Sequence, residues 1–81
     1  MLKVYVNRYN LLWVREEYFG LSKHMVGKLS HMSPSTVAKA EHCGNVHRLT
    51  LYKLFYFYRR IYRKLKKLNP NYKANVELIW P

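Results

Sequence analysis

Cysteine, proline, glycine and acidic side chains are all scarce in this sequence. Its 81 residues include one cysteine, three prolines, three glycines and four acidic residues. A single cysteine, Cys43, cannot form an internal disulfide, so we expect a chain suited to the reducing cytoplasm. Four carboxylates against fifteen Lys and Arg give a formal net charge of +11, which favours polyanionic partners such as nucleic acid or an anionic membrane.

A long apolar run is also missing. The most apolar stretch, residues 49–58, contains Lys53 and is about half as long as the ~20 residues of a membrane span. The first residues have neither the apolar run nor the cleavage site of a signal peptide. We therefore expect one soluble, cytoplasmic domain covering 1–81, with no membrane partner. Such a chain builds one modest core and no catalytic cleft of usual size, so we expect neither an enzyme nor a small-molecule ligand.

Metal and nucleophile patterns are absent as well. His31, His42, His47 and Cys43 are candidate ligands, but one cysteine without a Cys-x-x-Cys spacing does not predict a zinc site. No acid or base pattern accompanies Cys43, so we expect an ordinary, partly buried thiol. We expect no metal and no cofactor.

The most informative stretch is GLSKHMVGKLSHMSPSTVAKAEHCG, residues 20–44. Ser22 lies just before an apolar helical pattern, which is a helix start signal. Ser33 and Pro34 open a second helix, because serine accepts unpaired amide hydrogens and proline fits the first helical position. Val37 and Ala40, three residues apart, predict a buried side for this second helix.

This stretch resembles the helix-turn-helix of the lambda-repressor-like family, which comprises phage repressors, Cro proteins and related bacterial regulators. The matching residues are Gly20-Leu21-Ser22, Val26-Gly27, Ser33-Pro34-Ser35-Thr36-Val37 and Glu41. The resemblance covers about residues 8–58. It departs at Ser30, where the family has leucine, and at His31, where it has the turn glycine. We expect Leu29 to replace the missing apolar contact and His31 to adopt the left-handed conformation.

The resemblance implies that the helix from Ser33 reads the major groove of duplex DNA. Lys39 is the main candidate for reading a base, since lysine can donate to guanine O6 and N7. Ser35 and Thr36 offer hydroxyls to a base or a phosphate, and Pro34 offers only apolar contact. Phosphate contacts are expected at helix ends and on the connection after this helix, from Ser22, Lys23, Lys28, Ser33, His42, Asn45, His47 and Arg48.

The flanking segments predict further elements. Alternating apolar residues predict short strands at about 2–6 and 72–80. Between the first strand and the helix-turn-helix we expect a first helix, capped by Asn7 or Asn10 and ended by Gly20. Its expected inner face is Leu11, Val14 and Tyr18, and its expected outer face is Arg15, Glu16 and Glu17. After the helix-turn-helix, Gly44 is the expected left-handed terminator and Asn45 the expected cap.

A long helix is predicted over about 46–68, as one helix or as two with a bend near Arg59. Apolar residues recur there at spacings of three and four, which keeps one seam along one side. Residues beyond about 57 have few expected partners within the chain, so we assign them to a homodimer together with the last strand. The expected interface is Tyr58, Ile61, Tyr62, Leu65, Leu68, Val76, Leu78 and Trp80. Whether the strands pair within or between chains stays open. The role of the basic run 59–67 also stays open: it is either a flanking phosphate contact or a solubilising face.

Together these features predict a mainly α-helical domain of four to five helices with a helix-turn-helix core at about 22–41 and short terminal strands. The expected function is sequence-specific binding of double-stranded DNA by a transcriptional regulator, a repressor of phage, plasmid or mobile-element type on a pseudo-palindromic operator. Two alternatives remain: an accessory DNA protein such as an excisionase or relaxosome component, and a protein-interaction module such as an antitoxin.

Overall fold

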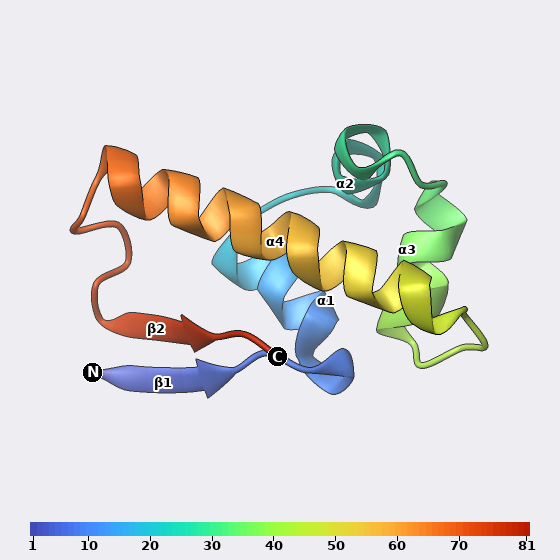
Figure 1. Ribbon diagram of the computed structural model, residues 1–81, viewed down its shortest axis with the longest axis horizontal. Helices are drawn as coiled ribbons and strands as arrows, with labels where there is room; N and C mark the ends of the chain where they lie inside the picture. The colour runs from blue at the N-terminus through green and yellow to red at the C-terminus, as the bar shows by residue number, and fades with distance from the viewer.

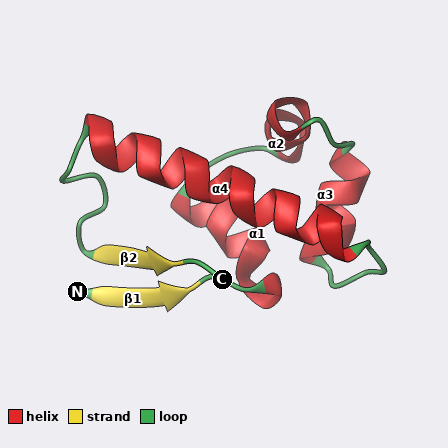
Figure 2. Cartoon of the chain, viewed as in Figure 1, coloured by secondary structure: helices red, strands yellow, loops and turns green.

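Four helices and a two-stranded sheet make up the computed structural model, which describes all residues 1–81 (Figures 1 and 2). In chain order the elements are β1 (Leu2–Tyr5), a 3-10 turn (Arg8–Asn10), α1 (Leu11–Trp13), a π-helical turn (Val14–Tyr18), α2 (Lys23–Ser30), α3 (Pro34–Glu41), α4 (Arg48–Leu68) and β2 (Val76–Ile79). The expected mainly helical chain with terminal strands is confirmed, and residues 48–68 form one helix without a break.

The two terminal strands pair with each other in parallel, within the chain. The register runs from Leu2 opposite Val76 to Tyr5 opposite Ile79, and the Val6 amide donates to the Ile79 carbonyl at 2.8 Å. The second strand is shorter than expected, because residues 72–75 form a turn in which Lys73 has a φ of 43°. The pairing brings the first and last segments of the chain side by side, with the two termini toward opposite ends of the sheet (Figure 1).

The first helical segment is capped by Asn7. Its side chain accepts from the Tyr9 amide at 2.8 Å, and its own amide donates to the Asn10 side chain at 2.9 Å. The segment then widens, because the Phe19 amide donates to the Val14 carbonyl five residues back, at 3.0 Å. Gly20, with a φ of 66°, ends it as expected.

The turn between α2 and α3 depends on capping and on one close approach. Ser22 accepts from the Met25 amide at 3.0 Å and Ser33 from the Thr36 amide at 3.1 Å, so both predicted caps are confirmed. His31 ends α2 in the left-handed conformation, with φ 60° and ψ 43°, also as expected. A Cβ on Gly27 would lie 2.6 Å from the Met32 carbonyl oxygen, so only glycine lets the backbone return this closely.

Leu29 does not supply the apolar contact expected of it. Its side chain is 53% exposed. Ser30 is half-buried at the family's leucine position, and its hydroxyl donates to the Val26 carbonyl at 2.6 Å. The helix therefore satisfies the serine locally instead of rotating, and Leu29 remains at the surface.

The connection to α4 also differs from expectation. Cys43, with a φ of 57°, adopts the left-handed conformation instead of Gly44, and its thiol is exposed instead of partly buried. His47 caps α4 instead of Asn45, since its Nδ1 accepts from the Leu49 amide at 3.1 Å. Gly44 is needed for a different reason: its amide donates to the Lys39 carbonyl at 2.7 Å, and a Cβ there would clash with the Lys39 side chain.

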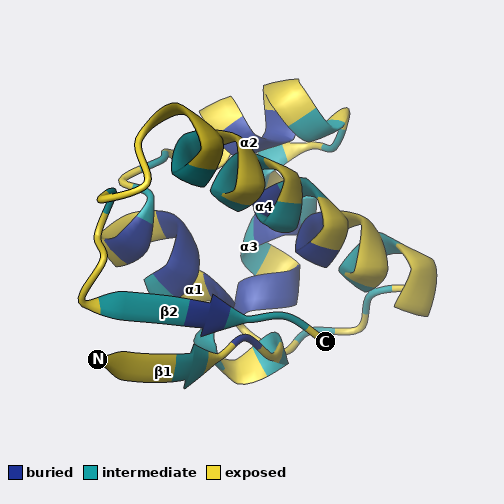
Figure 3. Ribbon diagram, turned by 60° about the vertical axis from the view of Figure 1, so that its left-hand side comes forward, coloured by how far each residue is buried: buried dark blue, intermediate teal, exposed yellow.

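The core lies where α4 crosses the first helical segment, α2 and α3, with the sheet closing one side (Figure 3). Its members are Val6, Leu11, Val14, Tyr18, Val26, Val37, Ala40, Leu54, Phe55, Tyr58 and Leu78. Tyr58 and Leu78 are 1% and 3% exposed, so assigning them to a dimer interface is wrong: the chain buries them itself.

Three more residues of the expected interface, Tyr62, Val76 and Trp80, are partly buried against the same core. The rings of Tyr62 and Trp80 lie 5.7 Å apart, and Tyr18 contacts Tyr62 at 6.1 Å between centroids. The far half of α4 therefore has partners within the chain, supplied by the sheet and the first helical segment. Of the expected interface, Ile61 and Leu65 are half-buried and Leu68 is 76% exposed.

Two buried tyrosines give the fold a pH dependence. The hydroxyls of Tyr18 and Tyr58 are buried without a hydrogen-bond partner. Burial, then the nearby Tyr62 and Tyr72, raises the pKa of Tyr18 to about 12, and burial, then Glu41, raises the pKa of Tyr58 further. A raised folded-state pKa means that the contribution of these two tyrosines to the free energy of unfolding is constant below about pH 10, the value for free tyrosine. It falls as the pH rises toward 12 and above.

We expect Tyr58→Phe to raise the free energy of unfolding by about 1 kcal/mol at pH 7, because it removes an unpaired buried hydroxyl. It should also reduce the loss of stability above pH 10. Urea unfolding at neutral and alkaline pH measures both effects, with Tyr9→Phe as control since Tyr9 is 85% exposed. A clear loss of stability in Tyr58→Phe at pH 7 would contradict the unpaired hydroxyl.

Candidate nucleic-acid interface

One side of α3 faces solvent and the other faces the core. Val37 and Ala40 are fully buried, whereas Ser35, Lys39 and His42 are exposed, as the spacing predicts. Figure 1 shows α3 and its connection to α4 at one end of the molecule, and most of the sheet toward the other. The outer side of α3 is therefore open to a partner.

Hydroxyl groups gather at the start of α3. Besides capping the helix, the Ser33 hydroxyl lies 3.0 Å from the Ser35 hydroxyl and 2.8 Å from the Thr36 hydroxyl. Ser33 and Ser35 are exposed, and Pro34 and Thr36 are half-buried. These hydroxyls already form hydrogen bonds with one another. A base or a phosphate would have to compete with those bonds. Lys39 is therefore the better placed of the base-reading candidates.

Lys39 is held by its stem and free at its end. Its methylene groups pass over Gly44, which leaves no room there for a larger residue. Its ammonium group takes part in neither of the two ion pairs of the structure.

The eight residues expected to contact phosphates are all exposed. They are Ser22, Lys23, Lys28, Ser33, His42, Asn45, His47 and Arg48. Three of them carry a full positive charge: Lys23, Lys28 and Arg48. Ser22 and His47 use one acceptor each in capping, which leaves the rest of those side chains available.

A buried ion pair fixes α3 to the first helical segment. Arg15 Nε donates to Glu41 Oε2 at 2.5 Å and Arg15 Nη2 to Glu41 Oε1 at 3.1 Å, while Arg15 Nη1 donates to the Leu21 carbonyl at 2.8 Å. Arg15 is 5% and Glu41 8% exposed. The hydrogen bonds to Glu41 raise the pKa of the Arg15 guanidinium, which stays charged.

Arg15 was expected on the outer face, and that prediction is wrong. The signal was present in the spacing: Arg15 follows Leu11 by four residues and therefore shares its face with Leu11, Val14 and Tyr18. A charged side chain is rarely buried unless a partner neutralises it. The partner of Arg15 is Glu41, which lies 26 positions away in the sequence. A second distant contact, from Arg8 Nη2 to the Gly44 carbonyl, ties the start of the chain to the end of α3.

The charge distribution leaves the surface strongly basic. Of the four carboxylates, Glu41 is buried in the ion pair, Glu77 is half-buried, and Glu16 and Glu17 are exposed. The basic run 59–67 lies on the half of α4 away from α3. A polyanion would therefore meet cations at either end of the molecule.

No three metal-binding side chains from His, Cys, Asp and Glu lie together. None of the helices combines the length and apolar character needed to cross a membrane.

Comparison with protein-family models, with curated proteins and with solved structures finds no match to this chain.

Proposed function

We propose that this protein binds double-stranded DNA in a sequence-specific way, with α3 in the major groove, and that it regulates transcription. The observation that carries this proposal is the exposed outer side of α3, which presents an unpaired Lys39. Exposed cations also lie on α2 and at the start of α4. A short helix with a small, polar outer side can enter the major groove. The lambda-repressor-like pattern in the sequence supports the same use of α3.

Regulation would then be steric, because bound protein blocks access to a promoter. We propose a repressor that binds as a homodimer, with two copies of α3 about 34 Å apart in successive major grooves. Of the residues expected at the dimer interface, Leu65 and Leu68 are left for such a dimer at the far end of α4.

The Lys39→Ala variant tests the proposal. Duplex fragments selected from random sequence should share a motif with the wild-type protein, and the variant should lose discrimination at one position, at a cost of about 1–3 kcal/mol. Lys3→Ala is the matched control, since Lys3 is an exposed lysine of β1 outside every candidate contact set. Absence of any shared motif with the wild-type protein would overturn sequence-specific binding. An equal loss on all sequences would reduce Lys39 to a phosphate contact.

A further inference from the structure

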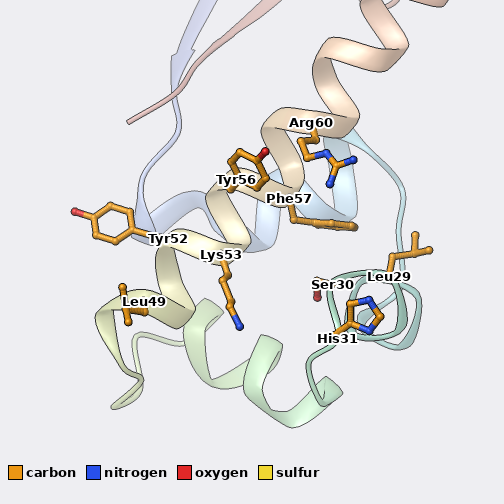
Figure 4. Close-up of a pocket in the computed structure, with 9 residues that line it drawn as sticks. All are labelled: Leu29, Ser30, His31, Leu49, Tyr52, Lys53, Tyr56, Phe57 and Arg60. Atoms are coloured by element: carbon orange, nitrogen blue, oxygen red, sulfur yellow. The ribbon is translucent and has the colours of Figure 1, made fainter.

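A groove runs between the end of α2 and the outer side of α4, and the proposed DNA contact does not use it. This α2–α4 groove has a volume of about 560 Å³, and its apolar lining is Leu29, Leu49, Tyr52, Tyr56 and Phe57. Figure 4 shows Phe57 directed from α4 toward the end of α2. A second hollow of about 280 Å³ continues it past Ile61 and shares Leu29, Phe57 and Arg60 with it.

The chain leaves this apolar lining uncovered. Leu29 is 53% exposed, Tyr56 61% and Leu49 66%. Scattered apolar side chains are ordinary on a protein surface, but a concave group of them indicates a binding site. On its other side, α4 supplies Leu54, Phe55 and Tyr58 to the core. The helix is therefore apolar both toward the core and along the groove.

The rim of the groove is positively charged. Lys53 and Arg60 line it, and Lys64 lines its continuation. No carboxylate lines either hollow. A second copy of this chain fits such a rim poorly, because Glu16 and Glu17 are its only fully exposed acidic side chains. The charge therefore favours an acidic partner from outside the chain.

We propose that the α2–α4 groove binds an acidic amphipathic helix of another protein. Apolar residues of that helix would fill the groove, and its carboxylates would meet Lys53, Arg60 and Lys64, which is a common mode of helix recognition. From Leu49 to Lys64, α4 spans about 22 Å, so the groove matches a helix of about 15 residues. Leu29 and Leu49 favour a protein over single-stranded nucleic acid, since aliphatic side chains offer bases no stacking surface.

This binding is separate from the proposed DNA contact. None of the residues that line the groove is a candidate for base contact or for phosphate contact at the helix ends beside α3. Only its far end, with Arg60 and Lys64, belongs to the basic run 59–67. A regulator built in this way would hold DNA with α3 and a second protein with α4. The groove and the DNA-binding surface can therefore be tested independently of each other.

The test uses the full-length protein without DNA and a synthetic peptide of about 15 residues as the probe. The peptide carries Leu and Phe at positions i, i+3, i+4 and i+7 and Glu at most others. Isothermal titration should show saturable binding at one peptide per chain, and a peptide with Lys in place of Glu should not bind. Leu29→Ser, Tyr56→Ser and Arg60→Glu should each weaken binding about tenfold or more. Tyr9→Ser is the matched control for Tyr56→Ser, and it should bind like the wild-type protein.

Three outcomes would overturn the proposal. The first is no binding of the acidic peptide by the wild-type protein, or equal binding by Leu29→Ser and Tyr56→Ser when circular dichroism shows them folded. The second is self-association in sedimentation that Leu29→Ser abolishes, which would assign the groove to a second copy. The third is displacement of the peptide by a single-stranded oligonucleotide whose own affinity falls in Tyr56→Ser.

Discussion

Glu41→Ala should lower the free energy of unfolding by about 3–5 kcal/mol, which is a large part of the stability of a domain of this size. The substitution leaves the Arg15 guanidinium buried, with only the Leu21 carbonyl as a close partner in the interior. A buried charge without its counter-charge is far more costly than the loss of the attraction itself. Urea unfolding followed by circular dichroism measures the change.

Two variants make this experiment specific. Glu16→Ala removes an exposed carboxylate that lies 3.4 Å from the same guanidinium, and it should change stability by no more than about 0.5 kcal/mol. Arg15→Met combined with Glu41→Leu removes both charges and should recover most of the loss. If Glu41→Ala were no less stable than Glu16→Ala, the ion pair would not be what holds α3 in place.

The proposed DNA complex should weaken steeply as salt is added. Lys23, Lys28 and Arg48 are the fully charged members of the candidate phosphate set, and each released counterion contributes about −0.9 to the slope of log affinity against log salt. One chain would then give a slope of about −2.7, and a pair of chains about −5.4. Raising the salt from about 50 to 200 mM should weaken binding roughly 40-fold for one chain and roughly 1,800-fold for two.

Fluorescence anisotropy with a selected duplex measures this slope. Lys28→Ala should make it shallower by about 0.9 for each bound chain, and Lys3→Ala should leave it unchanged. A slope near zero would rule out phosphate contacts as the source of affinity. A slope that Lys67→Ala makes shallower and Lys28→Ala does not would place the phosphates along α4 instead of beside α3.

The local signals of the sequence were dependable because each needs only neighbouring residues. Ser22, Ser33 and Asn7 cap their segments by bonding amides two or three positions away. Gly20 and His31 take left-handed conformations that their own side chains permit. The same rules failed between His42 and His47, where several residues are suited to the same roles. In the structure Cys43 takes the left-handed turn and His47 caps α4.

Predictions about faces and partners were weaker, because they depend on elements far away in the sequence. A seam of apolar residues predicts that one side of α4 is buried. It does not predict which other elements cover that side. Tyr58 and Leu78 were assigned to a second chain, whereas the chain covers them with its own sheet and first helical segment. Arg15 was placed outside because a charged side chain is rarely buried without a partner, and its buried partner, Glu41, lies 26 positions away.

The sequence alone determined the helical segments, most of their ends, the presence of two terminal strands and the excess of positive charge, because hydrophobic spacing, capping and composition act over a few residues. Only the tertiary structure decided that the strands pair in parallel within one chain, that Arg15 meets Glu41, and that Leu29 and the outer side of α4 form a groove. These are contacts between segments separated by tens of residues. Their free energy depends on what else is buried with them, and no local pattern records that.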